Sequence, residues 1–517
     1  MRPRSTPANN LGSIKAAGLH ANFSRHAIPS AAWQQMTEFA HKSGLERAIA
    51  DTFSGSKFNN TEDRAVLHTA LRRPTHQSLL LDGIDIMQSI QQTHDQMESI
   101  TEQLHSGDLM GAGGVPITDV VHLGIGGSDL GPVMLHQALS PYKQTKIDFH
   151  FFGNVDLGYL QQQLSLLNPA TTLVIIVSKS FRTYETLTNA SLTKKWMLEA
   201  GLDTDQVDNV FYAVTSNLNE AKKWGVRDNR VLPLWDWVGG RFSMWSAVGL
   251  SIAMMIGMDH FRDLLAGAHA MDVHFQSAAF DQNIPVTMGL LGVWYGAVMQ
   301  VPTQAIVAYS EYLRYFKDYC QQQQMESLGK RVSSSGELLE YPTGSIIWGG
   351  VGSNTQHSFH QLLMQGSHMV PIDFILPLYN HSGTRNDDLI ANCLAQSEVL
   401  WNGESESSLH SQAKSLSNGN AHLESLIPHR VIPGGMPSSL ISMQKLDPHS
   451  LGALVALYEH SVLVKGVLLG INPYDQWGVE SGKKIATSVL AALHADTTDV
   501  IGDEITSNLL KTCGITK

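Results

Sequence analysis

The sequence has few cysteines and no excess of basic residues. Its three cysteines, Cys320, Cys393 and Cys513, are odd in number, widely spaced and without a CxxC pair. This argues against a disulfide scaffold and makes a reducing cytoplasm the expected location. Lysine and arginine number 35 against 47 aspartates and glutamates, giving a net charge of -12. Since binding to a phosphate backbone requires a basic face, we expect no nucleic acid partner.

Long uninterrupted apolar runs are also scarce. The basic start MRPRSTPANN lacks the apolar run of a signal peptide. No charged residue occurs from Gln282 to Ser310, but proline, glycines and a glutamine interrupt its apolar part, and no lysine or arginine flanks it closely. We therefore expect a buried helix at 284–301, a soluble protein and no membrane partner.

Motifs for metal ligation are missing, although the chain has 23 histidines. His357 and His360 are three residues apart and can share a helix face. No HExxH motif and no closely spaced set of histidines and carboxylates accompanies them. A metal-dependent enzyme is thus the weaker alternative, and the sequence predicts no metal site.

What the chain does have is a regular alternation of short apolar strands and helical stretches. Two units share one pattern, in which a strand runs into a small-residue loop and then a helix; their strands are expected at Val120–Leu123 and Leu173–Val177. Short loops between alternating strands and helices are typical of parallel sheets covered by helices. Further strands are expected at 147–152, 210–216, 305–309, 345–348 and 370–376.

The length of 517 residues exceeds what one hydrophobic core supports, so we expect more than one domain. The predicted architecture is α/β, with two sandwich domains. The smaller is placed at 85–260, and the larger is assembled from 1–84 and 261–517. The serine-rich stretch 403–425 has few apolar residues and is interpreted as a surface excursion.

The first loop, Gly124-Ile125-Gly126-Gly127-Ser128, follows a strand and precedes a helix expected to begin near Ser128 or Asp129. Glycines there permit positive φ angles and close approach of a ligand, and the following helix directs free amides at an anion. The spacing does not fit the dinucleotide motif GxGxxG. A simple glycine turn is the alternative.

The second loop is SKSFRT, at 178–183, where another helix begins. Hydroxyl, amide and ammonium groups at a helix start can hold a phosphate dianion through charge-assisted hydrogen bonds. A polar helix cap with solvated charges is the alternative. Two such loops in one α/β unit favour a phosphate site.

Two long segments make the resemblance to a known family specific. DWVGGRFSMWSAVG, at 236–249, and GINPYDQWGVESGK, at 470–483, resemble the two signatures of the glucose-6-phosphate isomerase family. Further landmarks are VHLGIGGSDLGP, SKSFRTYET, QMESLGK and NTQHSFHQLLMQG, so that the resemblance covers roughly residues 30 to 515. It implies two three-layer α/β/α domains of the sugar-isomerase (SIS) type and an aldose-ketose isomerase that needs no cofactor.

The resemblance also implies roles for particular residues. Glu326 matches the base that moves a proton between C1 and C2, and Arg241 matches the cation that stabilises the enediolate. His357 and Lys483 match the pair assigned to ring opening, and Glu185 matches the carboxylate that orients the histidine. Contacts to the sugar phosphate are implied for Gly127, Ser128, Ser178, Lys179, Ser180, Thr183, Gln322 and Gln476. In the family a neighbouring subunit contributes the histidine, which implies a homodimer with shared active sites.

Three of these residues also have a plainer interpretation. Without the motif, Glu326 would be a solvated carboxylate, Arg241 a structural ion-pair partner and His357 a buried core histidine. The chain departs from the family pattern at Arg182, Tyr184 and Gln324, and at Gly350-Val351, where the family usually has Glu-Pro. None of these departures removes an implied catalytic group.

Two other functions remain compatible with the sequence. A non-catalytic sugar-phosphate sensor would bind the same ligand, but it has no need for Glu326, Arg241, His357 and Lys483 together. A second activity on mannose 6-phosphate is also open, because part of the wider superfamily handles both epimers.

Overall fold

The computed structural model describes residues 11–416, 421–495 and 503–514. Contacts between residues divide the chain into two compact units, Met1–Pro473 and Tyr474–Lys517, which are described separately. The division predicted from the sequence, 85–260 against the remainder, stays a prediction.

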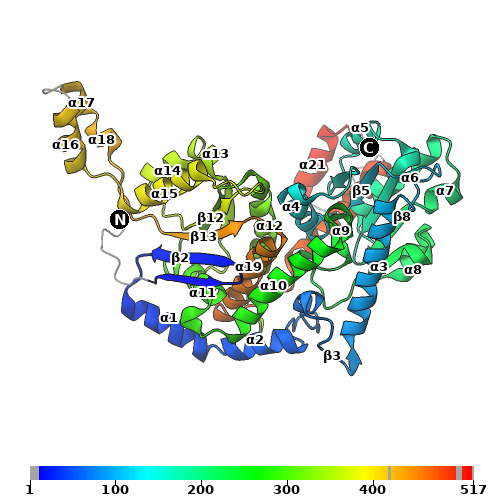
Figure 1. Cartoon of the computed structure of the whole chain (residues 1–517), viewed down its shortest axis with the longest axis horizontal. Coiled ribbons are helices and arrows are strands. Elements are labelled where there is room, and N and C mark those ends of the chain that lie inside the picture. The colour runs from blue at the N-terminus through cyan, green and yellow to red at the C-terminus, as the bar shows by residue number, and fades with distance from the viewer. Residues whose placement is uncertain (1–10, 417–420, 496–502, 515–517) are drawn as a thin grey trace. The chain divides into compact units, whose positions relative to one another are not determined.

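A five-stranded parallel sheet occupies the part of the first unit drawn on the right of Figure 1. Its strand order is β6-β5-β7-β8-β9, with every neighbouring pair parallel. The strands expected near 120, 147, 173 and 210 are all present, and the short edge strand β9 was not foreseen. The bounds are β5 Asp119–Leu123, β6 Asp148–Phe152, β7 Thr172–Val177, β8 Phe211–Thr215 and β9 Val231–Pro233.

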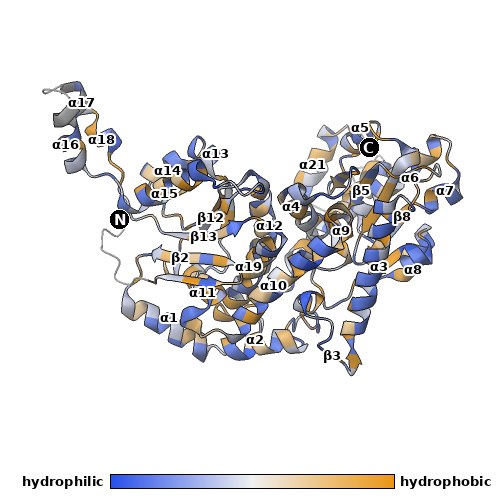
Figure 2. Ribbon diagram, in the orientation of Figure 1, coloured by the Kyte–Doolittle hydropathy of each residue, from blue (hydrophilic) through white to orange (hydrophobic). Residues whose placement is uncertain are grey.

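Helices cover both faces of this sheet, because its central strands are apolar on both sides. In β7, Leu173 and Ile175 pack into one hydrophobic cluster, and Val174 and Ile176 pack into another. Such continuous apolar strands are expected where a parallel sheet is buried on two faces. Figure 2 shows the contrast with the outer helix α8, which is largely hydrophilic. One face carries α3 Ile86–Ser106, α4 Leu130–Ala138 and α9 Leu250–Ile256; the other carries α5 Leu157–Leu164, α6 Tyr184–Glu199, α7 Thr204–Asp208 and α8 Leu218–Trp224.

A six-stranded mixed sheet has the order β1-β2-β13-β12-β10-β11. Its parallel part contains the strands expected near 305, 345 and 370. The sequence analysis missed β13 and the antiparallel hairpin formed by β1 and β2, which pairs with it. The bounds are β1 Ser13–Ala16, β2 Leu19–Arg25, β10 Thr303–Ala308, β11 Ile346–Val351, β12 Ile372–Tyr379 and β13 Ser438–Lys445.

This sheet also lies between two helical layers, as Figure 1 shows. Ile306 and Ile375 pack toward one layer, while Val307 and Phe374 pack toward the other. The helices of the first layer include α10 Met258–Ser277, α11 Ile284–Val293 and α19 Pro448–Leu468; those of the second are α14 His360–Gln365 and α15 Asp387–Asn402. Two α/β/α sandwiches are therefore present, and the predicted α/β fold class is confirmed.

One described helix, α19, is long and apolar enough to cross a membrane by length and composition alone. Of its most apolar window, 94% is buried inside the protein, so it serves as a core helix. The apolar segment at 284–301 is also helical and buried at first, but α11 ends at Val293 and a π-helix, Trp294–Val298, follows. Val298 and Met299 are exposed, so the predicted buried helix was too long.

The segment predicted as a surface excursion contains two helices, α16 Glu406–Leu416 and α17 Ala421–Ser425. Leu409 of α16 packs against Ile427 in a separate small cluster. The remaining elements of the first unit are α1 Ser30–Lys42, α2 Leu45–Ser54, α12 Phe316–Gln321, α13 Gly352–Gln356, α18 Ile427–Arg430 and the hairpin of β3 Leu80–Leu81 and β4 Ile84–Asp85. The second unit contains α20 Glu480–Ala495 and α21 Glu504–Thr512.

Candidate active site

The segment 236–241 is where the candidate residues of the first unit come together. It follows β9 and ends in a 3-10 turn, Gly240–Phe242. The Lys179 ammonium group donates hydrogen bonds to the carbonyl oxygens of Asp236 and Val238, both at 2.9 Å. These bonds attach the loop after β7 to the start of the segment. They leave one of the three ammonium hydrogens for a ligand.

The glycine loop after β5 contacts the same segment further along. A Cβ atom at Gly127 would lie 2.1 Å from the carbonyl group of Gly240, a distance that no side chain tolerates. A Cβ atom at Gly126, whose φ is +59°, would lie 3.1 Å from Nε2 of Gln322. Glycine is thus required at 127 for close approach of two backbones, and the loop lies between Gly240 and Gln322.

Arg241 is buried and its guanidinium group is held from several sides. Nε donates to the Ser327 hydroxyl at 2.6 Å, and Nη2 donates to the Pro473 carbonyl at 2.7 Å. Nη1 lies 3.5 Å from a carboxylate oxygen of Glu326. Because its geometry is fixed by neutral acceptors, the cation can stabilise negative charge beside Glu326 without reorganising.

Glu326 ends a π-helix, Gln322–Glu326, which continues α12. Single π-turns within helices are rare and frequently mark functional sites. The Glu326 side chain keeps 24% of its surface exposed, whereas that of Arg241 keeps only 2%. The carboxylate therefore lies on a buried cation and still faces solvent.

The loop SKSFRT and the glycine loop both lead into helices that begin without a side-chain cap. Thr183 stands at the N-cap position of α6 and Asp129 at that of α4, and neither side chain accepts from the helix amides. Helix α4 thus begins where it was expected, next to Asp129, but without a cap from the Asp129 side chain. Since β5 and β7 are parallel neighbours, the two uncapped ends lie at the same edge of the sheet. Free amides there favour an anion.

Further features of the SKSFRT loop fit an anion site. The Ser178 hydroxyl lies 3.0 Å from the Thr183 hydroxyl. Phe181 has a φ of 49°, which is uncommon outside glycine, and its buried ring holds the loop in this conformation. Burial lowers the pKa of Lys179 to about 8, so the ammonium group is charged at neutral pH and loses charge as the pH rises through 8.

Two predicted site residues of the first unit, His357 and Glu185, are not joined to this cluster by a described contact. His357 follows α13 and is exposed, and no hydrogen bond or ion pair among the described residues connects it to Glu185. Gln476 and Lys483 belong to the second unit, where Lys483 pairs with Glu480 at 2.7 Å. Ser180, which lies within the SKSFRT loop, accepts a hydrogen bond at its carbonyl oxygen from the Asn217 side chain at 3.4 Å.

The sequence profile of the phosphoglucose isomerase family matches residues 22–510. The chain belongs to the phosphoglucose isomerase family. A relative from Francisella philomiragia subsp. philomiragia, named glucose-6-phosphate isomerase, is 44% identical over 486 residues, or 94% of this chain and 90% of that protein. One of the same name from Marinomonas sp. is 43% identical over 502 residues, covering 96% and 92%.

Solved structures agree with membership of the phosphoglucose isomerase family. A crystal structure of a glucose-6-phosphate isomerase from Chlamydia trachomatis has a TM-score of 0.85 at 29% identity, covering 99% of this chain and 94% of that one. A hypothetical protein from Thermus thermophilus has a TM-score of 0.66 at 21% identity, covering 89% and 97%. The second likeness shows the fold alone.

The departures of this phosphoglucose isomerase family member from the family pattern lie around the site. Arg182 is 70% exposed and lies 3.7 Å from Glu220. Gln324 is buried in the π-helix and accepts a hydrogen bond from the Lys465 ammonium group at 2.7 Å. Gly350 and Val351 end β11. Of these residues, only Gln324 belongs to the element that carries Glu326.

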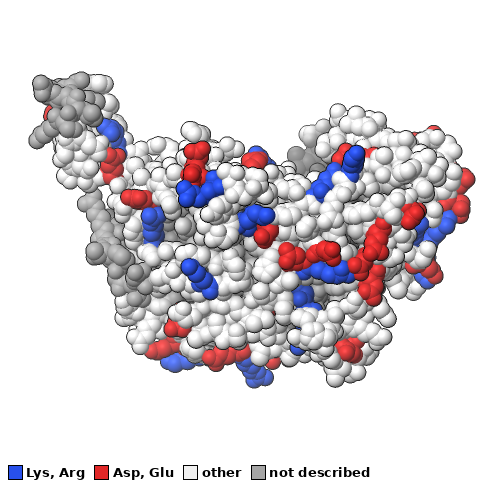
Figure 3. Space-filling model, viewed as in Figure 1, with Lys and Arg blue, Asp and Glu red and all other residues white. Residues whose placement is uncertain are grey.

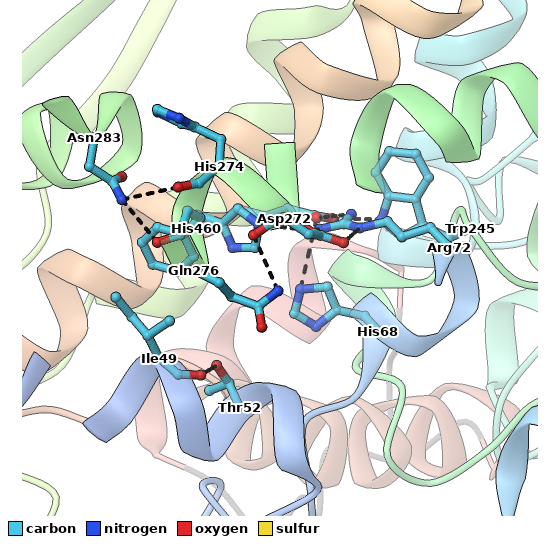
Figure 4. A network of polar contacts seen from close by, with 12 residues as sticks. Ile49, Thr52, His68, Arg72, Trp245, Asp272, His274, Gln276, Asn283 and His460 are labelled. Atoms are coloured by element: carbon cyan, nitrogen blue, oxygen red, sulfur yellow. Dashed lines mark hydrogen bonds and ion pairs between the residues drawn. The ribbon is translucent and has the colours of Figure 1, made fainter. Parts of the chain in front are cut away.

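Figure 4 shows a buried charge network that the sequence analysis missed. The Arg72 guanidinium group donates two hydrogen bonds to the Asp272 carboxylate, at 2.8 and 2.6 Å, and another to Glu459. His460 lies 2.7 Å from the same Asp272 carboxylate. These four side chains come from three helical segments and have almost no exposed surface.

The network also contacts the segment that follows Arg241. The Trp245 indole donates to Glu459 at 2.8 Å, and the Arg72 guanidinium lies 4.8 Å from the Trp245 ring centre. The Phe242 ring stacks on His68 with centroids 4.8 Å apart. Burial acts to raise the pKa of Asp272, but the attraction of Arg72 outweighs it and the pKa falls to about 2. The network of charged side chains therefore supports the segment that follows Arg241.

Charge on the molecular surface is mixed. On the face drawn in Figure 3, basic side chains lie among acidic ones without a large field of one sign. Within the residues that the structure describes, no group of three or more histidines, cysteines and carboxylates is arranged to hold a metal ion. The positive charge of the candidate site thus comes from Lys179, Arg241 and helix amides.

Proposed function

We propose that this chain interconverts glucose 6-phosphate and fructose 6-phosphate, a step of glycolysis and gluconeogenesis. Membership of the phosphoglucose isomerase family is the support for this class of reaction. The mechanism is supported by the Glu326 carboxylate, which lies 3.5 Å from the fixed Arg241 guanidinium group. Arg241 belongs to the segment 236–241, which also binds Lys179.

The phosphate of the substrate binds at the uncapped starts of α4 and α6. Backbone amides, the hydroxyls of Ser128, Ser178, Ser180 and Thr183, and the Lys179 ammonium group provide the donors. The Gln322 side chain adjoins the glycine loop, and its Oε1 is buried without a hydrogen-bond partner among the described residues, which suits it to accept from a sugar hydroxyl. A phosphate held in this way fixes the distance from C1 and C2 to the base.

Glu326 then carries the proton. Its carboxylate removes the proton from C2 of the open-chain aldose, and the C–H electrons form the double bond of a cis-enediolate while the C1 oxygen becomes negative. The glutamic acid returns the proton to C1, and the proton of the C2 hydroxyl passes to the negative C1 oxygen, so that C2 becomes the ketone and C1 carries the hydroxyl. Arg241 stabilises the enediolate oxygens, because a fixed cation contributes most where the site is shielded from water.

Ring opening is assigned to His357 and Lys483, with Glu185 orienting the histidine. An imidazole transfers protons readily near neutral pH, as the exchange between the ring oxygen and the C1 hydroxyl requires. Since His357 is exposed and has no described contact with Glu185, we place it in the active site of a partner subunit in a homodimer. The enzyme acts in the cytoplasm, and residues 85–260 fold as its smaller domain.

An assay with purified protein tests the reaction. Fructose 6-phosphate is added, and glucose 6-phosphate is followed through a coupled dehydrogenase, with and without EDTA. Turnover that EDTA does not reduce supports a metal-independent isomerase. Binding of fructose 6-phosphate without turnover would replace the isomerase with a sugar-phosphate sensor.

Replacing the anion site should weaken substrate binding more than turnover. In the double variant Ser178→Ala, Lys179→Ala, we expect KM to rise by about 10²-fold, because two charge-assisted contacts to the phosphate are lost. Steady-state kinetics measure the change. The matched control is Ser191→Ala, Lys195→Ala on the exposed face of α6, which should leave KM unchanged. A loss of turnover at saturating substrate, with KM unaffected, would refute a holding role.

Shared active sites predict complementation between two inactive variants. Glu326→Gln and His357→Ala are each expected to be nearly inactive. When the two proteins are mixed and allowed to exchange subunits, roughly a quarter of wild-type activity should return, because half of the dimers are mixed and each has one intact site. Subunit exchange is followed with differently tagged chains. Mixed dimers that form without regaining activity would place both residues in the same subunit's site.

A further inference from the structure

Lys465 is a buried lysine that the mechanism does not use. It lies in the last turn of α19, and the residue is only 6% exposed. Its side chain crosses Gly292 of α11, where a Cβ atom would lie 2.3 Å from the lysine Cε. The ammonium group donates to Oε1 of Gln324 at 2.7 Å. Burying a lysine ammonium group is costly unless it is paired and hydrogen-bonded, so its burial in a groove left open by a glycine indicates a specific role.

Asp373 in β12 is a buried carboxylic acid group whose charge acts on Lys465. The Asp373 carboxylate accepts hydrogen bonds from Gln304 at 2.8 Å and from Tyr458 at 3.0 Å. Burial lowers the pKa of Lys465 to about 8, and the attraction of Asp373 acts against this. The ammonium group is therefore charged at neutral pH, and its bond to Gln324 is charge-assisted.

Gln324 is the residue through which the Lys465 ammonium group contacts the π-helix. It stands two residues before Glu326 in the same turn. The preceding residue, Gln323, donates to the Tyr319 hydroxyl at 3.3 Å, and that hydroxyl donates to the carbonyl oxygen of Arg241 at 3.2 Å. The turn is thus attached to α19 through Gln324, and to the Arg241 backbone through Gln323 and Tyr319.

A π-turn is rare in proteins and occurs mostly as a single turn inside an α-helix. In this one, two successive residues are bonded to side chains outside the turn, Gln324 to Lys465 and Gln323 to Tyr319. If the turn relaxes, Glu326 changes its position relative to Arg241. A displacement of about 1 Å in a reacting group can cost about 10²-fold in rate.

We propose that Lys465 is a positioning residue, which fixes the π-helix 322–326 through its hydrogen bond to Gln324 and so holds Glu326 beside Arg241. The inference rests on the proposed function, since it concerns the base of that reaction. It assigns to the departure at Gln324 a specific task, which is to accept the bond from this lysine.

The first test is Lys465→Met, which keeps the length of the side chain and removes its donors. We expect kcat per folded enzyme to fall by about 10- to 10²-fold while KM stays within about twofold, because the phosphate site is untouched. With substrate deuterated at C2, the fraction of label carried to C1 should also change. This fraction depends on where the base sits and is independent of the amount of folded enzyme.

The double variant Lys465→Met, Gln324→Met separates positioning from stability. It removes both members of the hydrogen bond and leaves neither of them unpaired in the core, so its melting temperature should exceed that of Lys465→Met. Its kcat should remain low. Recovery of wild-type kcat would overturn the proposal, and this variant also carries the test if Lys465→Met does not fold.

Val455→Ala is the control for general weakening of α19. Val455 is fully buried in the same helix, ten residues before Lys465. We expect a lower melting temperature with unchanged kcat per folded enzyme and unchanged label transfer. An identical pattern in Lys465→Met would show that the lysine is structural only. If the wild-type protein has no turnover, the proposed function fails; if it is active and Lys465→Met keeps its kcat, only this inference fails.

Discussion

Glu326→Gln is expected to bind fructose 6-phosphate and to lose turnover by about 10³- to 10⁴-fold. The amide has the shape of the carboxylate but cannot accept the C2 proton. Folding should be preserved, because Arg241 keeps its bonds to Ser327 and to the Pro473 carbonyl. Turnover is measured with the coupled assay and binding by calorimetry with the same sugar phosphate.

Glu337→Gln is the matched control for this substitution. Glu337 is an exposed glutamate that follows the π-helix closely in sequence, and it has no part in the proposed site. Its turnover should equal that of the wild type. If Glu326→Gln keeps near wild-type turnover while Glu337→Gln is also active, the proton is carried by another group and the assignment of the base is wrong.

The largest effect on stability is expected from Arg72→Met. The substitution leaves the carboxylates of Asp272 and Glu459 buried without the cation that lies between them. Removing one partner of a buried ion pair costs about 3–5 kcal/mol, because the remaining charge stays desolvated. The midpoint of urea unfolding, followed by tryptophan fluorescence, should fall accordingly.

The next residue provides the comparison. Arg73 is partly exposed and donates to Gln77 at 3.0 Å, outside the buried network. Arg73→Met should change the free energy of unfolding by no more than about 0.5 kcal/mol. Equal unfolding midpoints for the two variants would mean that the network contributes nothing to stability.

The central parallel strands were predictable because their signal is local. In β7 six apolar or β-branched residues in succession lie between polar loops, and such a run is typical of a strand buried on both faces. Strand β13 gives a weaker signal. Its sequence, SSLISMQK, contains three serines, and its pairing with β2 becomes evident only in the fold.

The residues of the candidate site also differ in how far the sequence alone could predict them. The glycine loop and the SKSFRT loop could be placed between a strand and a helix from the sequence alone, whereas their binding of an anion stays a prediction. Glu326 was not predictable in this way, because nothing local distinguishes its carboxylate from the other glutamates; only the resemblance did. The π-turn that carries it was also unforeseen, since its contact to Lys465 comes from a distant part of the chain.

The buried network was missed for a related reason. Arg72, Trp245, Asp272 and Glu459 are scattered over most of the sequence, and each lies in an ordinary helical or turn context. An isolated charge in a sequence is usually solvated, so burial of all four is a property of the tertiary fold. The positions of charged residues in a sequence predict such a network only when its members are close in sequence.

The order of strands in the larger sheet has a consequence for biosynthesis. All strands of the smaller sheet lie between Asp119 and Pro233, so that sheet can close while the ribosome is still making the rest. The hairpin β1–β2 is made first, yet its partner β13 begins only at Ser438. A nascent chain that stops before Ser438 exposes two strand edges, on β2 and on β12, and exposed edges promote aggregation. Pairing of β13 thus joins an early and a late part of the first unit, and the edges of β2 and β12 need protection until β13 has been made.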